Sequence, residues 1–143
     1  MVLVPTPLEK IKRVDYSQIT KQDFFSGLIN NGELIVIGSS TTTNKLIYQV
    51  PGGKTLFIIS SSVIANVTAG ALNTFYIYIE NTNKSINWLP VQNTGTYVSE
   101  KSYTIPLKVQ STNRIYAVSS AGHYLGYGLI GYLVQNSLIP NFL

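Results

Sequence analysis

Residues 74–80 read Thr74-Phe75-Tyr76-Ile77-Tyr78-Ile79-Glu80, and this stretch decides the fold class. Successive side chains of a β-strand point to opposite faces, so Phe75, Ile77 and Ile79 share one face and the alternating residues share the other. A period of two with an apolar face is typical of a strand that packs one side on a core. The stretch therefore predicts a half-buried strand.

The same alternation of β-branched and aromatic residues with polar ones runs through the chain from Glu33 onward. It predicts about eight strands, near Glu33–Gly38, Lys45–Val50, Lys54–Val67, Thr74–Glu80, Ile86–Val91, Tyr97–Val109, Arg114–Val118 and Tyr124–Gln135. Short stretches rich in Gly, Asn, Ser and Thr separate them, and no helical stripe of useful length follows residue 30. The pattern predicts an all-β domain over residues 31–143, either a sandwich or a barrel.

Residues 1–30 differ in composition and are predicted to form an N-terminal arm. Pro5 and Pro7 keep its start extended. Further on, an N-cap signal at Thr20 precedes Phe24, Phe25 and Leu28, which form one apolar face of a short helix. The arm is therefore expected to hold one short helix.

Three of the predicted strands have apolar residues on both faces. These are Leu34–Ile37, Leu56–Ile59, and Leu129, Ile130, Leu133 and Val134 of the last strand. A two-layer sandwich has only one interior, so the second face of these strands needs another cover. Self-association supplies such a cover, and the arm folding back over the sheet supplies another. The sequence leaves both open.

Composition restricts the function. The 143 residues include no cysteine, and only 11% are charged, where an average soluble protein has about 25%. The net charge is +4, but the basic residues are scattered, apart from a few near the N-terminus, so a nucleic-acid partner is not expected. No targeting segment is recognised. The longest apolar stretch, Leu125–Val134, is about half a membrane span and holds three glycines, so no span is expected.

Candidate catalytic groups are few. Gly53-Lys54-Thr55 copies the end of a phosphate-binding loop, but Tyr48 stands where the motif needs its first glycine and a strand follows instead of a helix. Pro51, Gly52 and Gly53 instead predict a tight hairpin turn.

His123 is the single histidine, and it lies in a turn without a serine-nucleophile motif. One histidine without thiols does not make a zinc site. Glu80 and Glu100 are the best-placed carboxylates for a glycosidase, yet surface roles fit them better. The sequence thus predicts no enzyme, and no catalytic, cofactor or metal site.

The aromatic residues are stronger candidates for a functional role than the ionisable ones. Ten tyrosines, five phenylalanines and one tryptophan stand among few charges. Five of them, on predicted strands or beside them, are candidate contacts: Tyr76, Tyr78, Trp88, Tyr97 and Tyr116. Such side chains stack on sugar rings or fill subunit interfaces, because they combine an apolar body with a polar tip. Core packing and ordinary surface positions are the third interpretation.

Two stretches resemble a known group of proteins. Residues 48–58, Tyr-Gln-Val-Pro-Gly-Gly-Lys-Thr-Leu-Phe-Ile, resemble a strand-turn-strand of small β-sandwich virion proteins of phages and archaeal viruses. Tyr103-Thr104-Ile105-Pro106, Arg114-Ile115-Tyr116 and residues 126–134 resemble the closing strands of the same group. The resemblance spans roughly residues 44–134. It implies a single jelly-roll-like antiparallel β-sandwich.

The resemblance also implies a role and partners. Such proteins are capsid, decoration, turret, spike or tail parts, so the chain is expected to be a structural subunit located in the virion, and in the host cytoplasm before assembly. Homo-oligomers are expected, for example a trimer or pentamer, together with other virion proteins. The alternative function is a glycan-binding attachment module that uses the exposed aromatic residues. No catalytic residue is implied.

Overall fold

The computed structural model describes residues 21–82, 84–141 and 143, which form eight strands, two short α-helices and two 3-10 turns, Ser120–Gly122 and Asn136–Leu138. Alternating apolar residues form the strands, and all eight predicted strands are present. Their bounds are β1 Glu33–Thr41, β2 Lys45–Gln49, β3 Lys54–Val67, β4 Asn73–Ile79, β5 Lys84–Val91, β6 Gly95–Val109, β7 Arg114–Ser119 and β8 Tyr124–Gln135. The helices are α2 (Lys21–Ser26) and α3 (Leu28–Asn31), where the sequence had predicted one.

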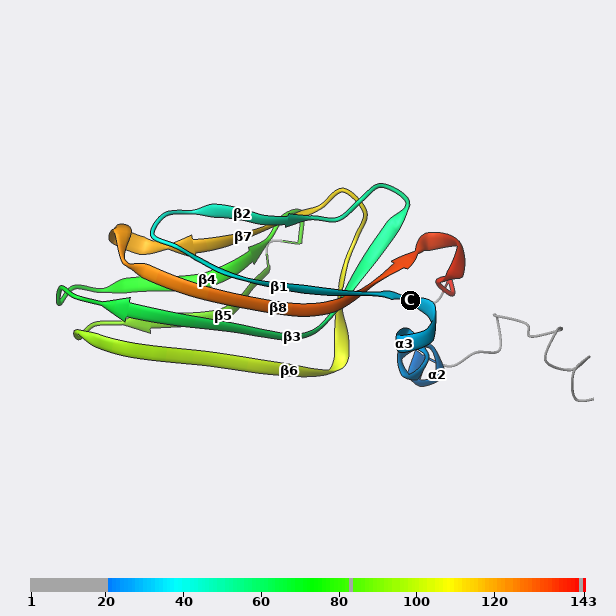
Figure 1. Ribbon diagram of the computed structural model, residues 1–143, viewed down its shortest axis with the longest axis horizontal. Helices are drawn as coiled ribbons and strands as arrows, with labels where there is room; N and C mark the ends of the chain where they lie inside the picture. The colour runs from blue at the N-terminus through cyan, green and yellow to red at the C-terminus, as the bar shows by residue number, and fades with distance from the viewer. Residues whose placement is uncertain (1–20, 83, 142) are drawn as a thin grey trace, which may run out of the picture.

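The strands form two four-stranded antiparallel sheets that face each other (Figure 1). Sheet A has the order β1-β8-β3-β6, and sheet B has the order β2-β7-β4-β5. The chain changes sheet at every connection except β4–β5, which is the pattern of a jelly roll. The predicted fold class, an all-β jelly-roll-like sandwich, is therefore confirmed.

The turn at Pro51-Gly52-Gly53 follows from this topology. Gly53 has a φ of +77°, which favours glycine, and the Lys54 N–H donates a hydrogen bond to the Pro51 carbonyl at 3.3 Å. The turn is present, but it is not the predicted hairpin turn. It joins β2 of sheet B to β3 of sheet A, so the flanking strands do not pair with each other.

The core lies between the sheets, where alternate residues of each strand meet. The side chains that are no more than 1% exposed include Leu56, Ile58, Val63, Phe75, Ile77, Ile79, Ile115, Ala117, Leu125 and Leu129. Phe75, Ile77 and Ile79 are the apolar face predicted from residues 74–80. Burying such side chains contributes roughly 1.5–3 kcal/mol each, which makes this layer the main source of stability.

The side chain of Asn87 forms hydrogen bonds between the two sheets within the core. Asn87 on β5 is fully buried, and its Nδ2 donates to the carbonyl oxygens of Ser61 on β3 and Ser99 on β6. The Ser61 hydroxyl donates to Asn87 Oδ1 and lies 3.1 Å from the Tyr103 hydroxyl. Asn87 also has a φ of +55°, at an irregularity in the β4–β5 pairing. This cluster links the two sheets with satisfied hydrogen bonds.

The helices build a second, smaller cluster on the outer face of sheet A. Phe24 and Leu28 pack there against Phe57 of β3 and Val134 of β8, and all four are buried. One of the two covers considered for the two-faced strands, the arm, is therefore present over part of the sheet. The end of the arm covers Phe57 and Val134, whereas other residues of the same face stay exposed. The boundary at residue 30 remains a prediction, since α3 runs across it, and residues 1–20 lie outside the described part.

Candidate functional site

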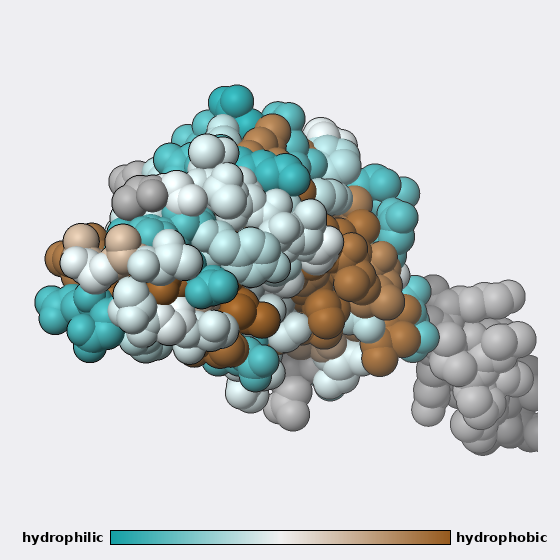
Figure 2. Space-filling view, turned by 60° about the vertical axis from the view of Figure 1, so that its left-hand side comes forward, coloured by the Kyte–Doolittle hydropathy of each residue, from teal (hydrophilic) through white to brown (hydrophobic). Residues whose placement is uncertain are grey.

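The outer face of sheet A carries exposed apolar side chains on all four of its strands. These residues point away from the core because they alternate with inward-facing ones, as Leu34 and Val36 do with Ile35 and Ile37. With their exposed fractions, they are Leu34 (55%), Val36 (66%), Ile64 (42%), Val98 (53%), Ile105 (73%) and Ile130 (36%). We call this set the sheet A face. Figure 2 shows part of it as the brown area on the right of the view.

The strand register brings several of these side chains next to each other. Val36 on β1 lies opposite Ile130 on β8, and Ile64 on β3 lies opposite Val98 on β6. The row of the sheet between these two pairs holds Ser62 of β3 opposite Gly128 of β8. There is no room for a side chain at position 128, because an added Cβ atom would lie 2.8 Å from the Ser62 hydroxyl oxygen. Such small residues leave a depression of about 410 Å³ in the sheet. The depression is also lined by Ser60, Ser102, Glu100 and Lys101, so the face is shallowly concave, with polar residues between its apolar pairs.

A larger groove of about 800 Å³ lies at the helical end of the same face. Between the pairs Ile58–Leu107 and Ser60–Ser102, only Ile59 of β3 faces residues 103–106 of β6. The extra residues make β6 bulge toward the helices. The groove is lined mainly by apolar side chains, among them Phe25, Leu28, Ile29, Ile59, Ile105 and Tyr132.

The outer face of sheet B carries the aromatic residues. Tyr76 and Trp88 stack with ring centroids 4.8 Å apart and an interplanar angle of 26°. Tyr78 lies directly opposite Tyr116 in the β4–β7 pairing. Four of the five candidate contacts therefore lie on this aromatic face, and Trp88 is 54% exposed. Tyr97 lies apart from them, because β6 belongs to sheet A and its ring packs against the core.

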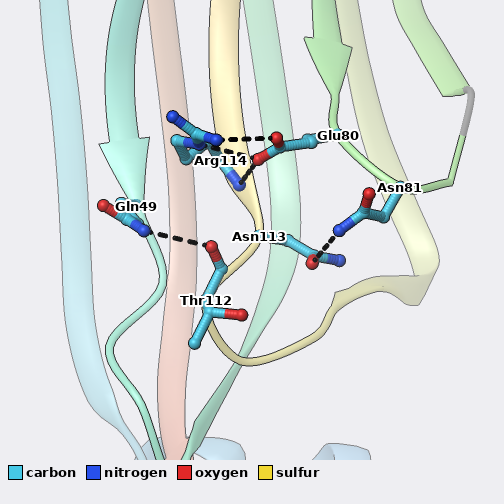
Figure 3. A network of polar contacts seen from close by, with 6 residues as sticks. All are labelled: Gln49, Glu80, Asn81, Thr112, Asn113 and Arg114. Carbon is cyan, nitrogen blue, oxygen red and sulfur yellow. Dashed lines mark hydrogen bonds and ion pairs between the residues drawn. The ribbon is translucent and has the colours of Figure 1, made fainter.

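Polar contacts fix the loops at one end of sheet B (Figure 3). Glu80 accepts hydrogen bonds from Arg114, at 2.9 Å from Nε and 3.0 Å from Nη2, and from its backbone N–H at 3.1 Å. These hydrogen bonds hold the pKa of the Glu80 carboxyl below its ordinary value.

The network continues along the loops, where Asn81 Nδ2 donates to Asn113 Oδ1 at 3.0 Å and Gln49 Nε2 donates to the Thr112 carbonyl at 3.2 Å. Thr112 has a φ of +69°, so this loop depends on its hydrogen bonds for its shape. The contacts tie the loops after β2, β4 and β6 together. Their geometry is that of a structural anchor, with Glu80 bound to one arginine.

The remaining candidates are dispersed. His123 follows a short 3-10 turn before β8, and its backbone N–H donates to the Ser120 carbonyl. Glu100 is exposed on β6 of sheet A, whereas Glu80 lies in the turn after β4 of sheet B. Within the described ranges, no group of three or more His, Cys, Asp or Glu side chains could hold a metal ion. None of the described helices is long and apolar enough to cross a membrane.

Comparisons with known proteins give structural matches alone. No protein-family model matches the chain, and a search of curated proteins finds no significant match. One solved structure that it resembles belongs to Bacillus endospore appendages, described as a novel family of disulfide-linked pili. That match has 13% identity, covers 73% of this chain and 92% of the other, and has a TM-score of 0.32.

Two further solved structures also match at low sequence identity and low TM-score. A chain of infectious bursal disease virus, Gt strain, is 12% identical, with 76% of this chain and 34% of the other covered and a TM-score of 0.34. A family 16 carbohydrate-binding module is 13% identical, with 73% and 72% covered and a TM-score of 0.26. All three are β-sandwich-like, and the likeness is one of architecture.

Proposed function

We propose that this chain is a self-associating structural subunit of a virion, and that the sheet A face is its assembly interface. The observation that carries the proposal is the six exposed apolar side chains on one sheet face. An antiparallel sheet that faces water commonly has a polar outer side, and exposed apolar side chains grouped on one face favour an interaction surface.

The distribution of charge supports the proposal. The charged side chains of sheet A lie toward its two edges, with Glu33 at the start of β1 and Glu100, Lys101 and Lys108 on β6. The central strands β8 and β3 carry only Lys54, at the first position of β3. The central strands are therefore almost free of charge, and a low content of charged residues is typical of the core of a protein–protein interface.

The virion part of the proposal rests on the resemblance of residues 44–134 to virion proteins. The fold agrees with it by analogy, because jelly rolls occur in viral capsid and lectin domains, although a fold alone does not determine function. A closed homo-oligomer such as a trimer or pentamer fits a subunit of this kind. The proposal contains no catalytic step.

A charge placed on the sheet A face is expected to dissociate the oligomer. Wild-type protein should elute with a mass that is a multiple of 15.7 kDa at micromolar concentration, and Val36→Lys should shift it toward 15.7 kDa. An uncompensated ammonium in an apolar interface is costly to desolvate. Size exclusion with light scattering measures the mass.

Leu46→Lys is the matched control, because Leu46 is 46% exposed on sheet B and points away from the core beside Tyr116. It should keep the wild-type mass. A wild-type protein that is monomeric at this concentration, or equal masses for the two variants, would contradict the proposal.

A second candidate function is glycan binding on the aromatic face, in a virion attachment role. It is favoured by the grouping of Tyr76, Tyr78, Trp88 and Tyr116 on one face. Neutral aromatic rings provide the apolar surface on which sugar rings stack, and their polar tips supply hydrogen bonds.

Replacing Trp88 by alanine is expected to weaken glycan binding about five- to tenfold, which corresponds to an aromatic contact of about 1–1.5 kcal/mol. A glycan array followed by titration of the best ligand measures this. Tyr124→Ala is the control, because Tyr124 is an aromatic residue 46% exposed on sheet A. If wild type binds no glycan, or if both variants bind equally well, this function is excluded.

A further inference from the structure

The sandwich has four edge strands, β1 and β6 in sheet A and β2 and β5 in sheet B. An edge strand presents a row of unpaired backbone N–H and C=O groups, to which another chain can add a strand. Folded proteins usually block such edges with proline, lysine, bulges or very short strands. The four edges differ in whether they carry such a device.

Three of the edges are blocked. β5 contains Pro90, begins at Lys84 and has a register shift opposite β4. β6 contains Pro106 within its bulge. β2 has only five residues, begins at Lys45 and has a shifted register against β7. β2 and β5 therefore offer no long, regular ladder, and the regular part of β6, Gly95–Ser102, carries the charged residues Glu100 and Lys101.

β1 differs in each respect. Its nine residues, Glu-Leu-Ile-Val-Ile-Gly-Ser-Ser-Thr, include no proline or lysine, and Glu33 at the first position is its one charge. It pairs with β8 over nine consecutive residues without a register shift. In the described part of the chain, β8 is the one strand that pairs with it. β1 is therefore a long and regular edge without a blocking device.

We propose that β1 pairs antiparallel with β1 of a second copy of this chain, so that two sheets A join into one eight-stranded sheet. This inference rests on the proposed self-association and names the strand through which two copies meet. A two-fold axis relates the copies, and the same edge then serves both. Strand addition at an exposed edge is a common mode of protein recognition.

Charge and side-chain size favour the antiparallel arrangement. With the axis at Ile37, the centre of β1, Glu33 of each copy lies opposite Thr41 of the other, and Val36 lies opposite Gly38. A parallel arrangement in register would instead place the two Glu33 carboxylates side by side, which is unfavourable. The antiparallel pair also extends the sheet A face across the two copies, since Val36 of one copy lies diagonally across from Val36 of the other.

Cysteine cross-linking tests the pairing, because the wild-type chain has no cysteine. Directly opposite residues of an antiparallel pair have Cβ atoms about 4.5–5.5 Å apart, close to what a disulfide needs. Under mild oxidation Ile37→Cys should form a disulfide-linked dimer. Ile35→Cys and Ser39→Cys should cross-link poorly alone, but a mixture of the two variants should form the mixed dimer, because residues 35 and 39 lie opposite each other.

Two further variants serve as controls. Ser85→Cys lies on the blocked edge β5, and Ile64→Cys lies on the sheet A face away from the edge. The inference is overturned if no β1 position cross-links more than Ser85→Cys, or if Ile35→Cys alone cross-links as well as Ile37→Cys. An oligomeric mass with cross-linking at Ile64→Cys alone would leave the proposed function standing without the β1 pairing. A monomeric wild type without any cross-link would remove both.

Discussion

Asn87→Ala is expected to lower the free energy of unfolding by about 3–5 kcal/mol. The substitution removes the two N–H donors to the carbonyl oxygens of Ser61 and Ser99, and it leaves the Ser61 hydroxyl with the Tyr103 hydroxyl as its remaining partner. Each group that stays buried without a partner costs about 1–3 kcal/mol. In addition, alanine tolerates the φ of +55° less well than asparagine, which visits the left-handed region more readily.

Asn81→Ala is the matched control for this prediction. Asn81 has a nearly identical backbone, with a φ of +63°, but it is exposed and its side chain donates to Asn113 at the surface. The control therefore includes the backbone effect and one surface hydrogen bond, and should cost about 1–2 kcal/mol. Urea denaturation with an unchanged slope measures both variants. If Asn87→Ala costs no more than Asn81→Ala, the buried cluster is not what holds the two sheets together.

The strands could be predicted because each is encoded locally. The alternation in residues 74–80 predicts β4 (Asn73–Ile79) to within one residue at each end, and Lys54–Val67 predicts β3 without error. Period-two patterns need no knowledge of the neighbouring strand. The two helices were harder to predict as separate elements. Gly27 divides them into pieces of six and four residues, and neither piece is long enough to show an apolar pattern of helical period.

The strand order was not predictable in the same way. β1 pairs with β8, which lies roughly 90 residues further along the chain. The local sequence of neither strand indicates which strand it pairs with. For this reason the aromatic candidates could be proposed only as a group of five. The structure separates Tyr97 from the others because β6 joins sheet A, whereas β4, β5 and β7 form sheet B.

Asn87 and the edge of β1 were missed for related reasons. Asn87 is one asparagine among many, and its burial depends on Ser61 and Ser99, which approach it from the opposite sheet. The absence of proline and lysine from residues 33–41 is visible in the sequence, but it matters only if that strand is an edge. Both features therefore needed the topology before they could be interpreted.

Phe57→Ala is expected to cost about 3–5 kcal/mol and to release the helices from the sheet. The Phe57 ring is 1% exposed and contacts the rings of Phe24 and Phe25 edge to face, with centroids 5.3 and 5.9 Å apart. Without it, α2 and α3 lose the centre of their only buried cluster among the described residues. Helices of six and four residues do not persist without packing.

Phe25→Ala is the control, because Phe25 touches the same ring but is only half-buried, so about 1–2 kcal/mol is expected for it. Hydrogen exchange distinguishes local from global loss: in Phe57→Ala, amides of residues 24–31 should lose protection while those of β4 keep theirs. Release of the helices would also uncover Val134 and extend the apolar sheet A face, so a larger oligomer is expected than in wild type. Equal losses in the two phenylalanine variants would mean that the helices do not depend on Phe57, and that this end of sheet A needs no cover from the arm.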